Sequence, residues 1–592
     1  MKIVITYPPG AYFFMPYLAP HLLKGHLQSE GHHEVRTEDL NLEYARSLWS
    51  EPFASAAAAT LADQGRRREA VLAELVARQG AASYAALRDE ATFADQWLVR
   101  FHATVLKRAA AVERALDADR RRAGTLPGRL GGWNRLRQAW SGSTLAAALD
   151  AAVADGRYDG ADLVGISVAY LPQMLAALLL AERLKARRPG LPIVVGGGAV
   201  THLLREFRTD EQVWAHVDYA VPYEGEHTFL ELVDSLETGR RTPINVVHRR
   251  GADIVYRQDL LGRPKVHAEP DFGDLRHEYP TPATIFPLLT SKGCYWGRCG
   301  FCTHHEGYGQ GYHRIDDAVF ERSLAALLRQ GARHFYFVDE AIPPRKLHSF
   351  ADRFAALADQ DPAVDVSWMA EARLERSLVS RAAVEQLAKS GCRLLVNGVE
   401  SAVPRVLDRM RKGIDIGLVA EHARLCAEVG GVRVGWMFFI GFPGETEVEA
   451  DETVAFIDRH RDVVDFAGIG TFGLERDSPI WVSPGEFSVS RIHDRDRPYR
   501  LDFDFDLEDG TTVRTADLPE RLRRLVAAHP GVETVLERAV DRALAFFFPR
   551  KPPASQAAPP VPAVCARLVW PSDIAGGVVE VDPSTRRLVV RR

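Results

Sequence analysis

Three cysteines lie within nine positions of the chain, at Cys294, Cys299 and Cys302, in the stretch SKGCYWGRCGFCTHHEGYGQGYHR (291–314). The other 583 positions of the 592-residue sequence hold only three more cysteines. Three thiols at this spacing could form a disulfide, bind zinc or hold an iron–sulfur cluster. Because the cysteines are few and unevenly placed, unlike a secreted disulfide framework, we expect a reducing cytoplasm, which disfavours the disulfide.

The choice between zinc and a cluster depends on the number of ligands. A structural zinc site usually has four ligands, in two pairs separated by a dozen or more residues. His304 or His305 could supply a fourth ligand, but it would crowd one tight loop. Three thiolates can instead hold three irons of a [4Fe–4S] cluster and leave the fourth iron open for a small molecule. Gly293, Gly297 and Gly300 would let the backbone come close to its sulfurs. Zinc and unligated thiols are the alternatives.

The elements around this loop alternate between apolar strands and amphipathic helices. Strands are expected at 285–290, 334–339, 365–370, 393–399, 432–440 and 464–472. Helices are expected between them at 317–330, 347–359, 379–390, 416–429 and 446–460. This order predicts a barrel, complete or partial, over 281–478. The functional residues of such a barrel lie at the C-terminal strand ends, and the cysteine loop directly follows the first strand.

Polar residues end several of these strands. They are Asp339 and Glu340 after FYFV, Glu371 and Arg373 in SWMAEAR, and Glu400 and Ser401 in LLVNGVES. Taken singly, each acid is more often a solvated loop residue or a helix N-cap, and Glu445 and Thr446 fit that interpretation. Acids at the ends of successive strands, on the same side as the cysteines, favour a shared site.

Another α/β series precedes the barrel. Strands are expected at 2–7, 34–42, 161–169, 192–198 and 217–226, and helices at 17–31, 172–190 and 227–239. This pattern predicts a Rossmann-like parallel sheet covered on both faces, over 1–240, with an Ala- and Arg-rich helical insertion at about 45–150. Gly196, Gly197 and Gly198 lack the spacing of a dinucleotide site and could merely form a tight turn.

The rest of the chain is assigned by composition. We expect a linker at 241–280 and a mixed α/β accessory region at 479–592, which contains a Pro-rich linker at 549–563. A net charge of −5 gives no case for nucleic acid or an anionic membrane as partner. The longest apolar run, 174–181, is too short to span a membrane, and the first residues show no secretory signal.

In the cysteine loop and the strand ends, the chain resembles the radical S-adenosylmethionine (SAM) superfamily. Its spacing is C-x4-C-x2-C, where the family usually has C-x3-C-x2-C. The resemblance implies a partial (β/α)6 TIM-type barrel whose three cysteines hold a [4Fe–4S] cluster. The open iron would bind the amino and carboxylate groups of SAM, and one electron would cleave SAM to methionine and a 5′-deoxyadenosyl radical. The implied SAM contacts are Phe301 near the adenine, Asp339 and Glu340 at the amino group, and Arg373, Glu400 and Ser401.

The first series resembles the cobalamin-binding domain found before many radical SAM barrels. The resemblance implies that Ser167 and the turn Gly196–Gly198 lie along the nucleotide tail of cobalamin, and that Glu224, Gly225 and Glu226 match the last recurring element. The loop 7–20 lacks the D-x-H-x-x-G motif that ligates cobalt from below. We therefore expect cobalamin with no protein histidine on its lower face, which would favour a four-coordinate Co(I) nucleophile.

These resemblances predict a cobalamin-dependent radical SAM methyltransferase. It would act on an unactivated carbon of a natural-product, peptide or cofactor precursor, with an electron donor such as flavodoxin or ferredoxin. Radical cyclisation or rearrangement is the second enzyme hypothesis, and a cobalamin or iron–sulfur sensor is the alternative outside enzymes. A methylthiotransferase is disfavoured, because the first domain has no second set of three cysteines.

Overall fold

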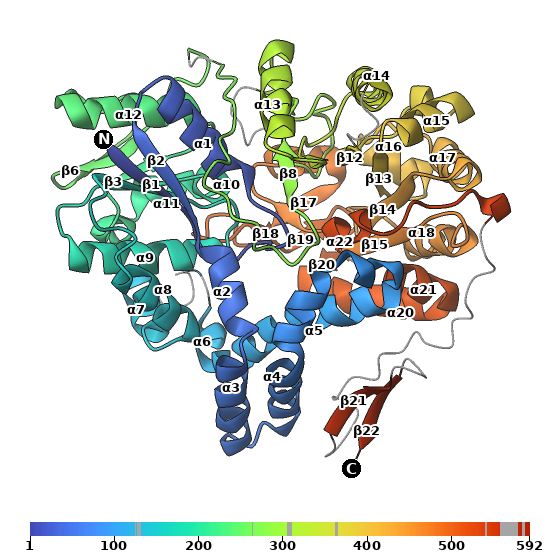
Figure 1. Cartoon of the computed structure of the whole chain (residues 1–592), viewed down its shortest axis with the longest axis horizontal. Coiled ribbons are helices and arrows are strands. Elements are labelled where there is room, and N and C mark those ends of the chain that lie inside the picture. Colours follow the sequence, from blue (N-terminus) through green and yellow to red (C-terminus); the bar gives the residue numbers. More distant parts are fainter. Residues whose placement is uncertain are drawn as a thin grey trace. The chain divides into compact units, whose positions relative to one another are not determined.

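The computed structural model describes residues 1–124, 126, 132–262, 265–304, 311–360, 365–538, 541–556, 578–582 and 587–591. His305, Cys565 and residues 557–563 of the expected Pro-rich linker therefore lie outside the described residues. Two units divide the chain. The first contains Met1–Thr284, and the second begins at Ile285 and contains the six expected barrel strands. Figure 1 labels the elements of both units.

The first unit is built on a seven-stranded sheet in the order β2-β1-β3-β4-β5-β6-β7. The first five strands are parallel, and β6 and β7 are antiparallel. The bounds are β1 (Lys2–Tyr7), β2 (Glu34–Asp39), β3 (Leu163–Ser167), β4 (Ile193–Gly196), β5 (Tyr219–Val221), β6 (Val247–Arg250) and β7 (Asp253–Val255). The predicted parallel sheet is confirmed.

Helices connect the strands of this sheet, since parallel strands need crossover connections. They are α1 (Leu18–Ser29), α9 (Gln173–Arg187), α10 (Gly198–His202), α11 (Leu204–Thr209) and α12 (Glu226–Thr238). Ile3 and Leu163 of the sheet share a buried cluster with Leu27 of α1 and Leu232 of α12. Burial of these side chains fixes the helices on the sheet and thereby the loops at its carboxyl edge.

The segment between β2 and β3 is helical, as expected for the insertion. It contains α2 (Leu40–Leu48), α3 (Glu51–Asp63), α4 (Arg67–Leu87), α5 (Gln96–Leu116), α6 (Ala118–Ala123), α7 (Trp133–Trp140) and α8 (Thr144–Ala154). In Figure 1, α3 and α4 lie side by side and extend away from the sheet of their unit. A Cβ at Gly80 would lie 2.3 Å from the Trp49 carbonyl oxygen, so this glycine permits a close approach of the backbones.

The segment expected as a linker, 241–280, belongs instead to the first unit. Its residues 247–255 form β6 and β7, and the chain after them is fastened to the domain. Lys24 pairs with Asp274 at 2.9 Å, and the Tyr279 hydroxyl donates to Asp39 at 2.8 Å. Composition could not reveal these contacts because their partners are distant in sequence.

The second unit contains a six-stranded parallel sheet in the order β15-β14-β13-β12-β11-β8. The bounds are β8 (Ile285–Leu288), β11 (His334–Phe337), β12 (Ser367–Ala372), β13 (Cys392–Glu400), β14 (Arg433–Ile440) and β15 (Phe466–Thr471). Since β8 and β15 do not pair with each other, the barrel is open, and the prediction of a partial barrel is confirmed.

The helices of this unit are α13 (Asp317–Arg329), α14 (Pro344–Gln360), α15 (Arg381–Lys389), α16 (Pro404–Arg409), α17 (Ile416–Val429), α18 (Glu447–Arg459), α19 (Pro479–Val482), α20 (Leu518–Ala528), α21 (Pro530–Arg538) and α22 (Arg542–Phe546). Phe337 and Trp368 of the sheet stack with Phe350 and Phe354 of α14. These aromatic pairs hold the helix layer on the outer face of the barrel.

The residues after β15 form short strands and the four helices α19 to α22. The strands are β16 (Leu474–Glu475), β17 (Val489–Ile492), β18 (Asp502–Phe503), β19 (Phe505–Leu507) and β20 (Thr512–Val513). Two further strands, β21 (Val578–Asp582) and β22 (Arg587–Arg591), pair with each other. The mixed α/β character expected for this region is thus present.

A strap formed by residues 548–551 crosses the N-terminal strand ends of the barrel. Arg393 donates to the Phe548 carbonyl at 3.1 Å, and Arg433 donates to the Pro549 carbonyl at 2.7 Å. The Lys551 carbonyl accepts from Gly431 at 2.7 Å. Arg393 and Arg433 stand at the starts of β13 and β14, so the strap lies at the end of the strands opposite to the cysteine loop.

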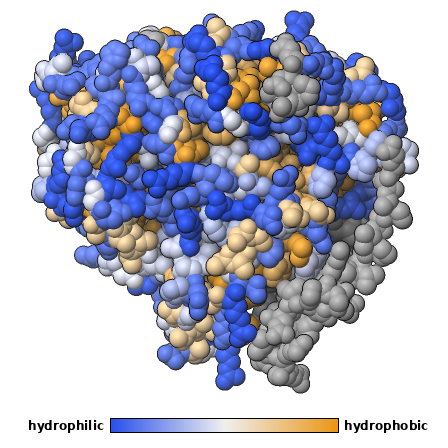
Figure 2. All heavy atoms as spheres, in the orientation of Figure 1, coloured by the Kyte–Doolittle hydropathy of each residue, from blue (hydrophilic) through white to orange (hydrophobic). Residues whose placement is uncertain are grey.

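No helix in the described part of the chain combines the length and the apolarity that a membrane span requires. On the face shown in Figure 2, hydrophilic residues cover most of the surface, and hydrophobic residues appear in separate groups.

Candidate functional site

The cysteine loop leaves the barrel after β8 and is closed by a short ladder. In this ladder β9 (Ser291–Lys292) pairs antiparallel with β10 (His313–Arg314). Gly293 has φ +73°, and a Cβ there would lie 2.8 Å from the Gly311 carbonyl oxygen. A side chain at position 293 would therefore both strain the backbone and separate the two arms of the loop.

The three thiols of the loop are half-buried and influence one another. Burial, reinforced by the Cys294 thiol, raises the pKa of the Cys299 thiol above its usual range. Burial and the thiols of Cys299 and Cys294 raise the pKa of Cys302 to about 12. The Cys294 and Cys299 thiols thus act on Cys302, so the three side chains lie near one another.

The separation of these thiols does not suit a single ion. Ligands on a tetrahedral zinc at 2.3 Å stand about 3.8 Å apart. Among the described residues, only one set of three histidine, cysteine or carboxylate ligand atoms falls within 4.8 Å, and the loop cysteines are not in it. They are therefore too widely spaced to be three ligands of one preformed metal site.

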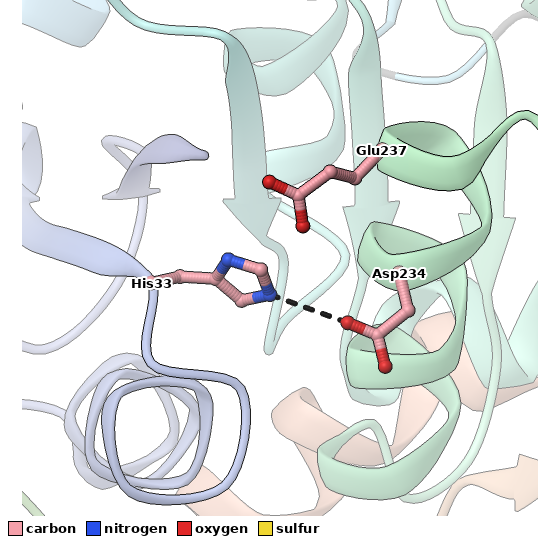
Figure 3. A group of neighbouring side chains, drawn as sticks. All are labelled: His33, Asp234 and Glu237. Carbon is pink, nitrogen blue, oxygen red and sulfur yellow. Dashed lines mark hydrogen bonds and ion pairs between the residues drawn. The ribbon is translucent and has the colours of Figure 1, made fainter.

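The ligand atoms that do lie within 4.8 Å of one another belong to His33, Asp234 and Glu237 in the first unit. Figure 3 shows the two carboxylates of α12 facing the His33 ring, with its Nε2 atom 3.4 Å from Asp234. The carboxylates are exposed, and the terminal amine of Met1 lies 3.2 Å from the other ring nitrogen. Lys2 opens β1, so this group stands at the amino edge of the sheet and is an ordinary surface charge cluster.

Asp339 anchors the start of the cysteine loop. Its carboxylate accepts from the Thr290 backbone N–H at 3.1 Å, from the Thr290 hydroxyl at 2.7 Å and from the Ser291 hydroxyl at 2.6 Å. The side chain is buried, and burial raises its pKa to about 6 against the opposing effect of these donors. Its oxygens are thus occupied by the loop, whereas the sequence suggested that they hold the SAM amino group.

Glu340, the next residue, has a different environment. Its Oε2 atom lies 2.6 Å from Nδ1 of His304, two residues after Cys302. The hydrogen bond to Glu340 raises the pKa of His304 to about 9. Thr303 beside it donates to Glu475 at 3.1 Å. The end of the cysteine loop is therefore enclosed by carboxylates.

Glu371, at the end of β12, is bound by two donors. The Tyr336 hydroxyl of β11 donates to it at 2.8 Å, and Arg542 of α22 pairs with it. His334 of β11 packs against the rings of Phe546 and Phe547. The last helix thus reaches the same strands that carry the site residues.

Arg373 acts on the cysteine loop through Trp296. Its guanidinium lies 3.9 Å from the centre of the Trp296 ring, and the Trp296 N–H donates to the Arg411 carbonyl at 2.8 Å. The same guanidinium donates to Glu375 at 2.6 Å and to the carbonyls of Lys412 and Gly413. The N–H groups of Arg373 are therefore bound by other groups of the protein.

Glu400 and Lys412 form an ion pair of 2.8 Å beside the thiols. Glu400 has φ +72°, and a Cβ at Gly398 would lie 2.6 Å from its Oε1 atom. Burial lowers the pKa of Lys412, but Glu400 and the thiols of Cys299 and Cys302 outweigh it, so the pKa is raised overall. The ammonium group thus carries a positive charge close to two of the three cysteines.

Phe301 and Ser401 occupy apolar and closed surroundings. The Phe301 ring meets Phe439 of β14 edge-on at 5.1 Å, beside a buried aromatic cluster. Ser401 is fully buried, and its hydroxyl lies 3.2 Å from that of Thr453. Ser401 therefore links β13 to α18, whereas Phe301 presents an aromatic surface beside the cysteines.

The residues expected at cobalamin lie at the carboxyl edge of the first sheet. Ser167 ends β3, is buried and lies in register with Gly196 at the end of β4. A Cβ at Gly197, which has φ +104°, would lie 2.6 Å from the Val168 carbonyl oxygen, and one at Gly198 would lie 2.9 Å from that of Ala169. These glycines permit the β3 and β4 loops to touch.

The EGE element follows β5 at the same edge. Glu224 and Glu226 are both buried, and Gly225 precedes the first residue of α12. A Cβ at Gly225 would meet a Leu23 methyl at 3.4 Å.

Sequence reasoning missed Lys412, Trp296 and the anchoring role of Thr290. Lys412 follows α16 in a turn that carries no periodic signal. Trp296 lies inside the quoted loop, but its contact with Arg373 spans 77 positions of sequence. Only its place among three cysteines could have drawn attention to it.

Two family models match the chain in the order of its units. Residues 144–233 match a B12 binding domain, and residues 288–457 match the Radical SAM superfamily. The chain thus contains a B12-binding domain followed by a radical SAM domain. Its cofactors are those of the two domains, namely SAM with a [4Fe–4S] cluster, and cobalamin.

Two curated relatives support this assignment. This radical SAM protein is 27% identical over 316 residues to an uncharacterized methyltransferase of Pyrococcus horikoshii, which covers 50% of this chain and 63% of the relative. It is 26% identical over 310 residues to the bacteriochlorophyllide d C-12(1)-methyltransferase of Chlorobaculum tepidum, covering 51% and 62%. The chain thus spans about three fifths of the length of these relatives.

A solved structure has the same fold. The radical SAM methyltransferase TsrM of Kitasatospora setae, with cobalamin and a [4Fe–4S] cluster bound, matches with a TM-score of 0.52 at 16% identity. The match covers 81% of this radical SAM protein and 74% of TsrM.

Proposed function

We propose that this radical SAM protein is a cobalamin-dependent methyltransferase that acts on an unactivated carbon. The observation that carries the proposal is the group of three neighbouring thiols at the C-terminal strand ends of an open parallel barrel, in a chain whose preceding residues match a B12-binding domain. The methyltransferase names of the two curated relatives support methyl transfer as the outcome.

Cys294, Cys299 and Cys302 fit a cluster, since the matched Radical SAM domain includes all three and their sulfur atoms are not gathered around one point. When bound, the cluster and cobalamin supply the electron that cleaves SAM and the carrier of the methyl group. Lys412 places a positive charge beside the thiolates and thereby offsets part of the negative charge that the cluster carries. Trp296 and Arg373 hold the loop in place.

We assign the SAM contacts to residues whose side chains lie beside the cysteine loop. Glu340 is assigned as the acceptor of the SAM ammonium group. In the structure its ionic partner is His304, whose place the ammonium group would take. Phe301 and Phe439 provide an apolar surface for the adenine. We assign Glu400, which is paired with Lys412, to the ribose and the carboxylate of SAM. Asp339 is a positioning residue, since its oxygens are occupied by Thr290 and Ser291.

Arg373 and Ser401 are also assigned positioning roles, in place of the SAM contacts that the resemblance suggested. Arg373 donates to Glu375 and to two carbonyls, and Ser401 is closed off against Thr453. Ser167, Gly196–Gly198 and Glu224–Glu226 are assigned to cobalamin, because they lie at the carboxyl edge of the parallel sheet, where such folds bind ligands.

The substrate class is a natural-product, peptide or cofactor precursor, and a flavodoxin- or ferredoxin-type protein is the proposed electron donor. Radical cyclisation or rearrangement is the competing enzyme function. It uses the same cysteine loop but transfers no methyl group. A cobalamin or iron–sulfur sensor is the alternative without catalysis.

One assay separates these three functions. The protein is reconstituted anaerobically with iron, sulfide and hydroxocobalamin and incubated with SAM and dithionite. Methyl transfer predicts both 5′-deoxyadenosine and S-adenosylhomocysteine, because one SAM is cleaved and another gives up its methyl group. Rearrangement predicts 5′-deoxyadenosine alone, and a sensor predicts neither product. The variant with all three loop cysteines changed to alanine is the control and should form no deoxyadenosine.

A further inference from the structure

The strand order of the first sheet places a switch point between β1 and β3. From β1 the chain runs to β2 on one side, and after the helical insertion it continues with β3 on the other side. In open parallel sheets, ligands bind outside the carboxyl ends of the strands at such a point, because the two loops there diverge. The loops concerned are 8–17, after β1, and 168–172, after β3.

Three tyrosines gather at this point. Tyr7 ends β1, Tyr17 precedes α1 and Tyr170 lies three residues after β3. The rings of Tyr7 and Tyr17 are stacked, with centroids 4.7 Å apart and an interplanar angle of 7°. Tyr170 meets Tyr17 edge-on at 6.2 Å. Tyr7 is 3% exposed and Tyr170 is 49% exposed, so the group extends from the core of the domain to its surface.

Polar contacts hold both loops in place. The Gln173 side chain donates to the Pro8 carbonyl at 2.7 Å and accepts from the backbone N–H groups of Ala169 and Tyr170 at 3.0 Å. Asn41 accepts from Gly10 and Ala11 and donates to the Tyr12 carbonyl. Because these bonds join the loops to each other and to α2, the tyrosines are displayed on a fixed surface.

The chemistry of this surface differs from that of a cobalt-ligating loop. Neither loop contains a histidine. Burial, reinforced by the neighbouring Tyr17 and Tyr170, raises the pKa of Tyr7 far above its usual range. Tyr7 therefore stays neutral, and a neutral phenol is a much poorer metal ligand than an imidazole. His21, on α1, is directed elsewhere, with Nδ1 3.1 Å from the Asp271 carbonyl and its ring against Phe272.

We propose that Tyr7, Tyr17 and Tyr170 form an aromatic shelf that supports the lower face of the corrin ring. Tyr17 and Tyr170 touch the ring, and Tyr7 holds Tyr17 from behind as a positioning residue. The shelf keeps both protein nitrogens and water away from the lower side of cobalt. This inference rests on the proposed function, because it assumes that the first unit binds cobalamin.

A gain-of-ligand experiment tests the shelf. The full chain is loaded with cobalamin, reduced to the Co(II) state and studied by electron paramagnetic resonance. The wild type should show no nitrogen superhyperfine splitting. Tyr17→His or Tyr170→His should introduce a triplet splitting, because each places an imidazole below the ring. Tyr170 is exposed, so its variant tests the proposal even if Tyr17→His fails to fold.

The matched control is Tyr219→His. Tyr219 belongs to the same sheet but opens β5, at the opposite strand end from the switch point. This variant should bind cobalamin like the wild type and show no splitting. A second readout is the affinity for cobalamin, measured by fluorescence quenching, which Tyr170→Ala should lower about five- to tenfold while the iron content and the melting temperature stay unchanged.

The outcomes distinguish this inference from the proposed function. If the wild type binds no cobalamin, the cobalamin function itself fails, and the shelf fails with it. If the wild type binds cobalamin but already shows nitrogen splitting, only the shelf is overturned. The same holds if both histidine variants bind cobalamin and neither shows splitting.

Discussion

The Asp339 carboxylate and the Thr290 backbone and hydroxyl groups join the end of β11 to the first residues of the cysteine loop. A buried carboxylate that accepts three such bonds fixes the direction in which the chain leaves β8. Glu340, one residue later, pairs with His304. Adjacent acids of one strand end thus have separate tasks, one at the base of the loop and one at its end.

This difference predicts opposite results for two conservative variants. Asp339→Asn replaces one acceptor oxygen with a donor that faces the donors of Thr290 and Ser291, so the reconstituted protein should lose most of its iron. Glu340→Gln should keep iron and melting temperature but lower 5′-deoxyadenosine formation at least tenfold, because the amide cannot hold the SAM ammonium group equally well. Iron content and chromatography of 5′-deoxyadenosine measure the two expected results. A normal iron content in the Asp339→Asn variant would show that Asp339 does not anchor the loop.

The second prediction concerns the cysteines. The triple change of Cys294, Cys299 and Cys302 to alanine should abolish the charge-transfer absorption of a [4Fe–4S] cluster after anaerobic reconstitution. Cys426→Ala is the control, since this buried thiol lies 3.6 Å from His422 and far along the sequence from the loop. It should keep about four irons per chain. Equal iron in both proteins would contradict the assignment.

The third prediction tests the packing behind the loop. A Cβ at Gly300 would lie 2.3 Å from the Phe487 ring, in the aromatic cluster that also receives Phe301. Gly300→Ala should cost about 1–3 kcal/mol of stability and displace Cys299 and Cys302, so iron content should fall. A Cβ at Gly485 would have no neighbouring atom within 4 Å, so Gly485→Ala should behave like the wild type. The iron contents of the two variants should differ clearly. Equal values would show that the Phe487 ring moves aside without displacing the loop.

The fourth prediction uses the pair of Glu400 and Lys412. Lys412→Met leaves the carboxylate without its partner in a nearly closed environment and should lower the free energy of unfolding by about 2–4 kcal/mol. The double variant Glu400→Gln and Lys412→Met should recover most of that loss, because no uncompensated charge stays behind. Chemical denaturation of the four proteins in the cycle measures the coupling. Additive losses would show that the two residues act independently.

The fifth prediction concerns pH. Burial raises the pKa of Glu445 to about 7, and its Oε1 atom finds no hydrogen-bond partner among the described residues. Between about pH 4.3 and pH 7 the folded chain keeps a proton that the unfolded chain has lost, so stability should fall as pH rises, by about 1–3 kcal/mol. Glu445→Gln should flatten this slope in melting curves from pH 4.5 to 8. An unchanged slope would assign it to other groups.

Much of the architecture was predictable because it depends on local patterns. The strands at 2–7 and 432–440 read as apolar runs of the right length, and the structure has them at Lys2–Tyr7 and Arg433–Ile440. Thr446 also behaves as expected, since it caps α18 in a box with Glu449. The three cysteines stood out by their spacing, because their separation along the chain already restricts the chemistry, and their role as cluster ligands stays a prediction.

Other features depend on contacts that no local pattern encodes. The strand after Glu34 was expected to reach residue 42 but ends at Asp39, because the Asp39 side chain accepts from Leu42 and starts α2. Residues 241–280 look like a linker in composition, yet Tyr279 reaches back to Asp39. Asp339 looked available for a ligand until its bonds to Thr290 and Ser291 were visible. The Asp39 cap is local, whereas the partners of Tyr279 and Asp339 lie 240 and 49 positions away in sequence.

The strap at 548–551 has a practical consequence. Because Arg393, Arg433 and Gly431 fasten it at the amino ends of β13 and β14, the strap lies at the end of the barrel opposite to the cysteines. A surface linker attached at the strap itself would therefore immobilise the protein with its cysteine loop at the far end of the strands. Such a preparation would suit electrochemistry on a solid support, where the reductant must reach the loop without obstruction by the anchor.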